Sequence, residues 1–306
     1  MTDSSEPIKV SIEETGQRLD KFVASRTENL SFVAIQKLLR TGQIRIDGKR
    51  AVGKKRIEAG NIIRIPSIFR NLKKSKFISY SELNDDLHSF VNDSILYKDK
   101  EIVAVNKPAG LAVQGGSRIY DHVDGLLDYF RFESPYRPQL LHRIDKETSG
   151  VLLLSRKPET TRRLSEAFRN REVKKIYWAF VIGHMPKTSG SINAPLATIN
   201  SKNFERAAFD LYGKECKTIY NVLWKGDFKY TKLSLVEFLP ETGRKHQIRA
   251  HCNHVGCSII GDNKYIRKTH RELKHLYQFS SNMQLHAIEI GIPDIEGITL
   301  RIKAPI

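Results

Sequence analysis

One carboxylate, Asp145, lies in a nine-residue run that could do chemistry. The run spans residues 142–150 (HRIDKETSG) and comes directly before the apolar residues 151–154. A short apolar run bounded by turn residues predicts a buried strand. Asp145 is therefore expected on a loop held against a rigid element, which suits a side chain that must be aimed at a reacting atom. An aspartate in this position can also be an ordinary turn residue or helix cap.

The run at 142–150 closely resembles the catalytic signature H-R-L-D-x-x-T-S-G of the RluA-type pseudouridine synthases, with Ile144 in place of leucine. Five more segments resemble patterns of this family in the family's order: 106–113 (NKPAGLAV), 175–183 (KIYWAFVIG), 242–251 (TGRKHQIRAH), 261–265 (GDNKY) and 285–287 (LHA). Lys245 replaces the threonine that the family has in the third of these. The resemblance covers about residues 90–306, and a chance match of all six segments in order is remote.

The short segment Gln114-Gly115-Gly116 is most similar to the RluC-like branch of the family, which acts on bacterial large-subunit ribosomal RNA. The resemblance therefore implies an enzyme that converts uridine to pseudouridine in RNA. This reaction detaches the base from C1′, rotates it and rejoins it through C5. Because nothing is added or lost, no cofactor is expected. The resemblance also implies that no metal is used.

Asp145 is the residue expected to catalyse this reaction. A carboxylate can attack the sugar covalently, or it can remove a proton and stabilise a cation-like sugar. Both routes need an ionised carboxylate in a partly dry pocket, so a nearby cation is expected. The resemblance implies Arg249 as this cation, with Arg244 as the second choice. Arg244 could instead contact a phosphate.

Tyr177 is the third residue to which the resemblance gives a catalytic role. It lies in the alternating run 176–182, where it shares a face with Ala179 and Val181. The resemblance implies that Tyr177 stacks on the target uracil and takes part in proton transfer at C5. A tyrosine on a strand can equally be a core residue.

The target base must leave its stack before the reaction can begin. The resemblance implies that Arg143 fills the vacancy, although an arginine there could also form a structural ion pair. Ile248 and Leu285 are expected to form apolar walls, and Asp262 is expected to form a turn. Four further residues around the cleft are predicted to contact RNA: His142, Lys107, Arg244 and His246.

The composition independently indicates a polyanionic partner. The chain has 51 Lys and Arg against 34 Asp and Glu, a formal net charge of +17. Such a balance favours nucleic-acid binding. Residues 37–76 contain 13 basic and 2 acidic residues, a net charge of +11, and residues 156–175 contain 8 basic and 3 acidic residues, a net charge of +5. A single charge run can be a solvated face, but a region with so little compensating acid favours a phosphate partner.

The first seventy residues read as a separate module. Helices are expected at 17–25 and 31–41, with Ser31 as a cap and Gly42 as a stop, and short strands at 8–14, 43–50 and 61–65. The order of these elements resembles the alpha-L RNA-binding module first known from a small-subunit ribosomal protein. Its sequence patterns occur at residues 18–20 and 38–44.

Four residues of this module are expected to face phosphates: Lys37, Arg40, Arg45 and Lys49. Such contacts position RNA without reading its sequence. The alternative is a small protein-binding module, which the charge disfavours.

The organisation expected for the chain is an alpha-L-type module with its linker at 1–85 and a pseudouridine synthase catalytic domain at 86–306. Residues 71–94 read as the linker. The catalytic part is predicted to be α+β, with a mostly antiparallel mixed central sheet and flanking helices. Its strands are expected at 102–105, 151–154, 176–182, 218–223, 232–238, 287–292 and 298–303. Its helices are expected at 122–131 and 159–170.

Several other classes of protein are disfavoured. The chain has no run of 18 apolar residues, so no membrane span is predicted. The polar N-terminus lacks the apolar stretch of a secretory signal. Three cysteines indicate a reducing compartment, so a cytoplasmic protein is expected, without a membrane or a required protein partner, as a monomer. A cluster with metal-ligand spacing, namely His246, His251, Cys252, His254 and Cys257, lacks the paired second half of a zinc site.

Three alternative functions remain on the sequence. A non-catalytic ribosome-associated RNA binder would explain the charge but not the set Asp145, Tyr177 and Arg249. A metal-dependent RNA hydrolase needs clustered carboxylates, and only Glu147 is close to Asp145 in sequence. A synthase that acts on transfer RNA shares the chemistry and differs only in substrate.

Overall fold

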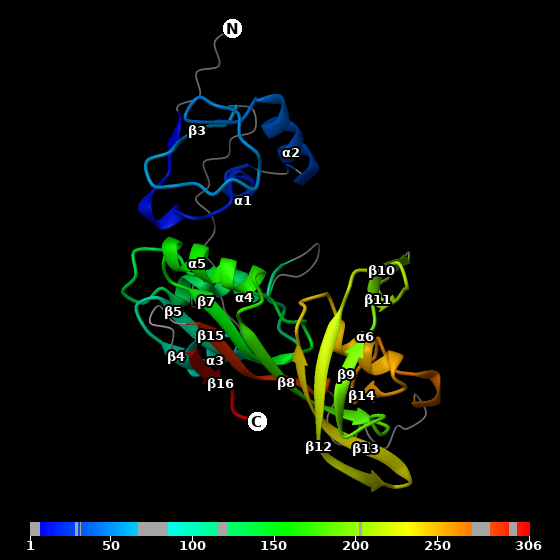
Figure 1. Cartoon of the computed structure of the whole chain (residues 1–306). Coiled ribbons are helices and arrows are strands. Elements are labelled where there is room, and N and C mark those ends of the chain that lie inside the picture. Colours follow the sequence, from blue (N-terminus) through cyan, green and yellow to red (C-terminus); the bar gives the residue numbers. More distant parts are fainter. Residues whose placement is uncertain are drawn as a thin grey trace.

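The computed structural model describes residues 7–27, 30, 32–66, 85–115, 121–201, 204–270, 282–293 and 299–306 of the 306-residue chain. Within these ranges a small N-terminal module lies beside a larger unit that is built on one sheet (Figure 1). The predicted cap Ser31, the residue Gly116 and most of the predicted linker lie outside the described residues. The domain boundary near residue 85 stays a prediction.

The N-terminal module packs two helices against a three-stranded antiparallel sheet of order β1-β3-β2. Its elements are β1 (Ile8–Lys9), the 3-10 helix η1 (Ile12–Glu14), α1 (Leu19–Ser25), α2 (Phe32–Thr41), β2 (Arg45–Ile46) and β3 (Ile62–Arg64). Its own core contains Leu19, Phe22, Ile35, Leu39 and Ile63. The two helices are as predicted, whereas the strands predicted at 8–14 and 43–50 are shorter than expected.

Two glycines shape the turns of this module. Gly42, at φ +75°, ends α2 in the left-handed region that side chains avoid. Asp47 and Gly48 have φ +49° and +72°, which is the geometry of the predicted Asp-Gly hairpin turn. The tight turn leaves only two paired residues in β2.

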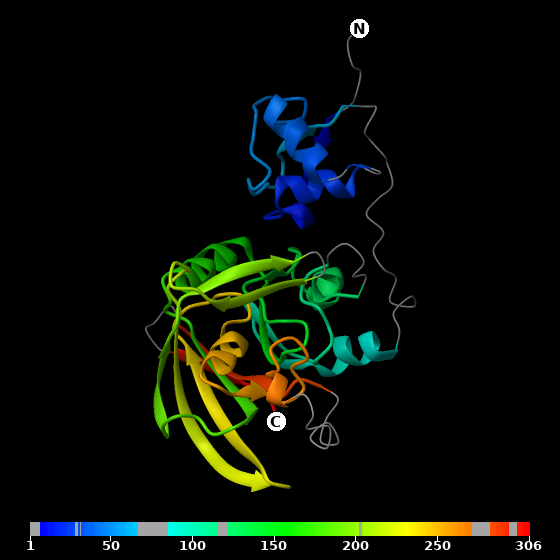
Figure 2. The ribbon, with the colours of Figure 1, turned by 90° about the vertical axis from the view of Figure 1, so that its right-hand side faces the viewer.

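The larger unit is built on an eleven-stranded sheet with the path β4-β5-β7-β15-β8-β13-β12-β9. Its strands are β4 (Ile95–Lys98), β5 (Ile102–Lys107), β6 (Gln139–Leu140), β7 (Ser149–Ser155), β8 (Lys174–Ile182), β9 (Ser189–Asn193), β12 (Lys217–Phe228), β13 (Thr231–Pro240), β14 (Ser258–Ile259), β15 (Leu285–Pro293) and β16 (Thr299–Lys303). A separate hairpin pairs β10 (Leu196–Ser201) with β11 (Phe204–Phe209). Figure 2 shows the long β12–β13 hairpin extending away from the N-terminal module.

Helices cover the sheet on both sides. They are α3 (Asp85–Asp93), α4 (Val123–Leu126) with its 3-10 continuation η4 (Leu127–Phe130), α5 (Pro158–Arg169), α6 (Gln247–His254) and the 3-10 turn η5 (Lys268–His270). The helices predicted at 122–131 and 159–170 are confirmed. Residues 85–93 were assigned to the linker, and this is wrong, because α3 buries Leu87, Phe90 and Val91 in the core of the larger unit.

The strand β15 joins the two halves of the sheet at its centre. It runs parallel to β7, through the pairs His286↔Ser149 and Ala287↔Gly150, and antiparallel to β8. Gly150 has φ +104°, and a Cβ there would lie 2.2 Å from the carbonyl oxygen of Ala287. Only glycine allows this close approach. The other pairings between described strands are antiparallel, so the predicted α+β class with a mostly antiparallel mixed sheet is confirmed.

Three apolar layers hold these elements in place. One face of β5 and β7 packs on α3, α4 and η4, and the opposite face packs on α5. A third layer joins β8 and β13 to α6. No helix among the described residues is long and apolar enough to cross a membrane.

Candidate active site

A cleft of about 1370 Å³ lies where the two halves of the sheet meet. Its lining comes from the loop before β7, from β8, from the end of β13 and the segment that follows it, and from α6. The cleft brings together nearly all of the cleft residues that the sequence predicted: His142, Arg143, Asp145, Tyr177, Arg244, His246, Ile248, Arg249 and Leu285. Gln114, from the segment that resembles one branch of the family, lines it as well. These residues are up to about 170 positions apart in the chain.

Arg249 links Asp145 to a second carboxylate. Its Nη1 donates to Asp145 Oδ2 at 3.0 Å, and its Nε and Nη2 donate to Asp262 at 2.7 and 2.8 Å. The Arg249 side chain is 6% exposed and that of Asp262 is fully buried, whereas Asp145 remains 24% exposed. Asp262 thus fixes the guanidinium of Arg249, and Asp145 accepts a hydrogen bond from it at the edge of the cleft.

The alternative cation, Arg244, lies in a different setting. Its side chain is exposed, and its Nε reaches only the carbonyl oxygen of Glu215, at 3.4 Å. The structure therefore pairs Arg249 with Asp145 and leaves Arg244 at the rim of the cleft. This arrangement fits a phosphate contact for Arg244.

Arg249 stays positively charged in the cleft. Burial lowers the pKa of Arg249, but the hydrogen bonds and charge of Asp262, followed by the charge of Asp145, raise it well above the usual value. Burial raises the pKa of Tyr177 far above its usual value as well, and the charge of Asp145 adds to this effect. At neutral pH the cleft therefore holds a cationic Arg249 and a protonated Tyr177 hydroxyl.

The helix α6 is pinned at its first residue. Gln247 accepts a hydrogen bond from Thr242 Oγ1 at 2.8 Å and donates to the Lys217 carbonyl and to Thr218 Oγ1, both at 2.9 Å. These bonds fasten the start of α6 to β12, and Arg249 follows two residues later. The pattern Thr-Gly-Arg-x-His-Gln-Ile-Arg therefore contains both Arg249 and the residues, Thr242 and Gln247, that hold its helix in place.

Tyr177 lies on β8 opposite Phe238, on the face that it shares with Ala179 and Val181, as predicted. It packs between the core of the β5–β7 half and the core beneath α6. Ile248 and Leu285 line the cleft close by. Ala179 is buried and is not among the residues that line the cleft.

Lys107 corrects one prediction. Its side chain is fully buried, and its ammonium group donates to the carbonyl oxygens of Pro108, Leu111 and Lys146 at 2.7 to 3.0 Å. A group enclosed in this way cannot reach RNA, so the predicted RNA contact of Lys107 is wrong. Because Lys146 follows Asp145, Lys107 instead anchors the loop that carries the carboxylate. Burial lowers the pKa of Lys107 to about 7.

His142 also has a structural partner. Its Nε2 accepts a hydrogen bond from the backbone of Leu153 at 3.0 Å, and its ring stacks on Phe168 of α5. Burial lowers the pKa of His142 to about 3, so the ring is neutral. It therefore fastens the 142–150 loop to β7. An RNA contact by His142 stays a prediction.

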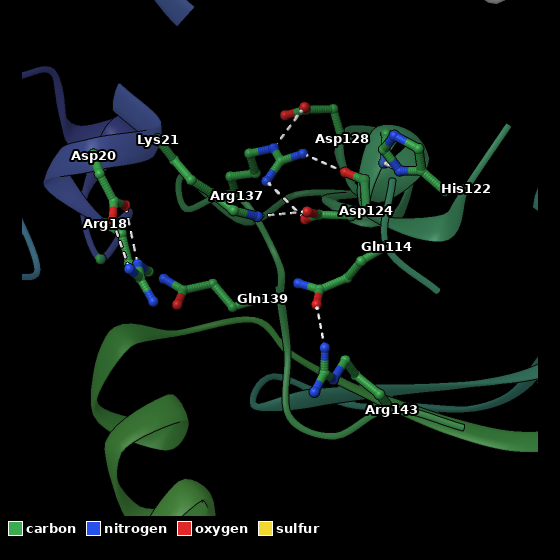
Figure 3. A network of polar contacts seen from close by, with 12 residues as sticks. Arg18, Asp20, Lys21, Gln114, His122, Asp124, Asp128, Arg137, Gln139 and Arg143 are labelled. Atoms are coloured by element: carbon green, nitrogen blue, oxygen red, sulfur yellow. Dashed lines mark hydrogen bonds and ion pairs between the residues drawn. The ribbon is translucent and has the colours of Figure 1, made fainter. Parts of the chain in front are cut away.

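Arg143 is exposed at the mouth of the cleft, where its Nη1 donates to Gln114 Oε1 at 3.2 Å (Figure 3). The segment around Gln114 is paired with α4, because the Asp124 amide donates to the Val113 carbonyl oxygen. The Asp124 carboxylate in turn accepts a hydrogen bond from Nζ of Lys21 in the N-terminal module, at 2.6 Å. The module thus touches the same loop system that holds Arg143.

A second contact between the two units involves Arg56 of the module. Its Nη1 donates to Gln139 Oε1 at 2.9 Å and to the carbonyl oxygen of Gly16. The four residues predicted to face phosphates, namely Lys37, Arg40, Arg45 and Lys49, are all exposed. Arg45 also donates to the carbonyl oxygens of Gly42 and Gly48, which holds its head over the turn.

Asp262 shows what the sequence interpretation missed. Its Oδ1 accepts from the amides of Lys264 and Tyr265, so the predicted turn is confirmed. Its second role, as the buried partner of Arg249, was not predicted. The Gly-Asp pattern at 261–262 was the available signal, because a carboxylate in a motif shared with Arg249 could have been tested as its counter-ion.

The residues with metal-ligand spacing are not gathered around a common point. His251 bonds Thr218 and the carbonyl oxygen of Ala194, while His254 contacts the ring of Phe209. Within the described ranges, no group of three or more His, Cys, Asp or Glu side chains could hold a metal ion. Cys252 and Cys257 are buried among apolar neighbours.

Residues 101–254, half of the chain, match the family model described as RNA pseudouridylate synthase. The chain belongs to this family. A relative from Buchnera aphidicola subsp. Baizongia pistaciae, "Ribosomal large subunit pseudouridine synthase C", is 37% identical over 90% of this chain and 85% of its own length. A relative of the same name from Vibrio cholerae is 32% identical over 82% of this chain and 77% of its own length.

A solved structure agrees with the fold. "Human RNA Pseudouridylate Synthase Domain Containing 1" superposes with a TM-score of 0.59 and 25% identity, covering 70% of this chain and 84% of that one. The protein is therefore an isomerase that acts on RNA.

Proposed function

We propose that this enzyme isomerises uridines in bacterial-type large-subunit ribosomal RNA and that Asp145 is its catalyst. The observation that carries the proposal is the hydrogen bond from buried Arg249 to one oxygen of Asp145, within a cleft lined by Tyr177 and two apolar walls. This arrangement gives the carboxylate a cationic partner and aims it, while one oxygen remains available to react. The chemistry of the family needs a carboxylate in that state.

Asp145 acts on the sugar of the bound nucleotide. Because Arg249 occupies Oδ2, the reacting atom is Oδ1. It either bonds C1′ or removes a proton from the sugar, and the bond between C1′ and N1 of uracil breaks. The detached base turns, and C5 bonds to C1′. In the covalent route the bond between Asp145 and C1′ breaks as this bond forms; in the other route Asp145 returns the proton to the sugar. C5 then loses its proton and N1 gains one. The product has the same atoms as the substrate.

Tyr177 holds the uracil during this turn. Its ring lies beside the apolar walls of Ile248 and Leu285, and aromatic stacking tolerates rotation of the base in its own plane. The high pKa of Tyr177 keeps its hydroxyl protonated, so it enters proton transfer at C5 only with another group as the acceptor.

RNA reaches the cleft past Arg143 and the N-terminal module. The planar guanidinium of Arg143, two residues before Asp145, fills the space left by the flipped base. Lys37, Arg40, Arg45 and Lys49 bind phosphates from the exposed side of the module, and Arg244 does so at the rim. His142 and His246 border the same path.

The ribosomal assignment rests on two observations. The relatives from Buchnera and Vibrio carry names that specify the ribosomal large subunit. Gln114 lines the cleft beside Arg143, where it can contact RNA next to the target. Specificity then comes from RNA shape and splayed bases, which permits more than one site. We expect a cytoplasmic monomer that needs no protein partner.

The test is modification in vitro of unmodified large-subunit ribosomal RNA and of a transfer-RNA pool, at equal concentrations near physiological salt. Pseudouridines are then mapped by chemical derivatisation and reverse transcription. We expect ribosomal sites to be modified first and the Asp145→Asn protein to modify neither RNA. Preference for transfer RNA would overturn the ribosomal assignment, and full activity of Asp145→Asn would overturn the catalytic one.

A further inference from the structure

Tyr265 ends the Gly-Asp-Asn-Lys-Tyr segment and has no part in the proposed function so far. Its side chain is buried, its amide is held by Asp262, and the guanidinium of Arg249 lies 5.0 Å from the centre of its ring. The hydroxyl group of Tyr265 meets two polar partners. The backbone amide of Ala207 in β11 donates to it at 2.7 Å, and Nδ1 of His246 lies 2.8 Å from it.

These two contacts fix the proton on His246. A tyrosine hydroxyl has one hydrogen to donate. Because the Ala207 amide is a donor, the hydroxyl oxygen accepts from it. Among the contacts of the described residues, Nδ1 of His246 is then the one acceptor within reach of the buried hydroxyl hydrogen. Nδ1 of His246 is then an acceptor without a hydrogen. In a neutral ring the hydrogen must therefore sit on Nε2.

Nε2 of His246 faces the reacting side of Asp145. It lies 3.8 Å from Oδ1, the oxygen that Arg249 does not bind. This distance is longer than a hydrogen bond, so the Nε2–H points toward the carboxylate and interacts with it as a dipole, without forming a hydrogen bond. With the opposite tautomer, a lone pair would face the carboxylate and repel it. The Tyr265 hydroxyl disfavours that arrangement, because its own buried hydrogen would then lack an acceptor.

The backbone also holds His246 firmly. It is one of the few non-glycine residues with a left-handed backbone, at φ +54° and ψ +26°, and it caps α6. A histidine in this region costs conformational energy, which the surrounding structure must offset. The strained backbone turns the side chain into the cleft, where only 9% of it is exposed.

The ring is neutral at physiological pH. Burial lowers the pKa of His246 to about 4, partly opposed by Asp145 and reinforced by Arg249, Lys264 and Lys245. Asp145 therefore faces one full positive charge, from Arg249, and one dipole, from His246. A second full charge would hold the carboxylate more tightly and make it a weaker nucleophile or base.

We propose that His246 is a positioning residue for the isomerisation, whose Nε2–H, fixed by Tyr265, orients the free oxygen of Asp145 toward the sugar. With Arg249 as its one partner, the Asp145 carboxylate could still rotate about the bond between Cβ and Cγ. The donor on the other side favours the orientation in which Oδ1 stays in the cleft. The relay runs from the β11 backbone through Tyr265 and His246 to Asp145. It rests on the proposed catalytic role of Asp145.

The direct test is the tautomer of His246, read by nitrogen-15 NMR of the histidine rings in the full-length protein. The signal is assigned by its loss in His246→Gln. We expect a neutral ring with the hydrogen on Nε2 at pH 7, and a shift toward a tautomer mixture in Tyr265→Phe. A hydrogen on Nδ1, or a protonated ring, would overturn the proposal without any measurement of activity.

The kinetic test compares three variants on the same ribosomal RNA fragment. His246→Leu removes the donor that faces the free oxygen of Asp145, and we expect kcat to fall about 10-fold or more with little change in KM. His246→Gln can place an amide N–H near the position of Nε2 and should recover most of kcat. His254→Leu, on the exposed end of α6, is the matched control and should leave kcat unchanged.

The split between kcat and KM separates positioning from a merely structural role. A structural loss at His246 would lower RNA affinity or the melting temperature in both variants, whereas loss of the donor should lower kcat in His246→Leu and not in His246→Gln. Wild-type kcat in His246→Leu, or equal losses in both variants, would overturn the proposal. If Asp145→Asn is inactive in the same assay, failure of the His246 prediction concerns His246 alone and leaves the proposed function intact.

Discussion

In the cleft, Arg249 uses all three nitrogens of its guanidinium on Asp145 and Asp262, and its side chain is 6% exposed. In the N-terminal module, Lys37, Arg40 and Lys49 extend from α2 and the following turn with exposed side chains. A buried charge is costly unless a partner with good geometry compensates it. An exposed charge costs little and stays available to a ligand.

The difference between the two regions separates chemistry from affinity. The cleft uses opposed charges to fix one carboxylate, so removing any of them should affect the rate steeply. The module spreads like charges over a surface, so removing one should affect binding slightly and removing all should affect it strongly. Each region can therefore be changed while the other is kept as an internal control.

The largest expected effect is that of Asp145→Asn. The amide keeps the shape and a hydrogen-bond acceptor for Arg249 but removes the reacting charge. We expect the isomerisation rate to fall by about a thousandfold or more, which corresponds to ~4 kcal/mol in the barrier. RNA affinity, measured by filter binding, should stay within about twofold, because the module is untouched. A variant that kept a tenth of the rate would show that Asp145 is not the catalyst.

The next effect is expected from Arg249→Ala, with Arg244→Ala as its control. Removing Arg249 leaves Asp262 buried without its partner and frees Asp145. We expect kcat to fall about a hundredfold and the melting temperature to fall as well, since breaking a buried pair costs about 3–5 kcal/mol. Arg244→Ala should raise KM for RNA and leave kcat nearly unchanged. The reverse pattern in steady-state kinetics would exchange the two roles.

Lys107 allows a test of stability that does not involve RNA. The folded protein releases the Lys107 proton near pH 7, whereas the unfolded chain keeps it to about pH 10.4. Unfolding therefore takes up a proton between these values, and stability should rise with pH in this window, by at most about 1.4 kcal/mol per pH unit. Urea unfolding at several pH values should show a flatter dependence in Lys107→Met. Equal slopes would mean that Lys107 stays protonated in its cage of carbonyl groups.

The smallest effect on chemistry is expected from removing the module. A chain that begins at residue 85 should modify a short RNA at saturating concentration with an unchanged kcat. Its affinity should fall about tenfold, and the slope of log affinity against log salt should become shallower by roughly 0.7–0.9 for each lost phosphate contact. An unchanged salt slope would show that the exposed charges of the module serve something other than RNA.

The sequence predicted the parts of the site that have local signatures. The alternation around Tyr177 and the apolar run after residue 150 define strands by themselves, and the structure has both. The helix α6 was missed, because its eight residues are nearly all buried and show little amphipathic contrast. Arg249 was therefore predicted as a partner of Asp145 without the element that positions it.

Other misses concern long-range contacts. The enclosure of Lys107 depends on carbonyl groups from two loops, and nothing in the local sequence marks a lysine as buried. The pairing of Arg249 with Asp262 joins a helix to a turn. The hydroxyl of Tyr265, which contacts His246, is also held by the amide of Ala207 in β11, a strand that was not predicted. Such contacts arise from packing, which a single sequence does not encode locally.

The central place of β15 decides when the enzyme can become active during its synthesis. Asp145 belongs to the half of the sheet with β5 and β7, while Tyr177 and Arg249 belong to the half with β8 and α6. Along the path of the sheet, β15 (Leu285–Pro293) stands between the halves, and it is synthesised after β7, β8 and α6. Pairings between distant parts of a chain form late. A nascent chain that already carries residues 101–254 should therefore still lack an assembled cleft, so the enzyme cannot act on RNA before β15 has been synthesised.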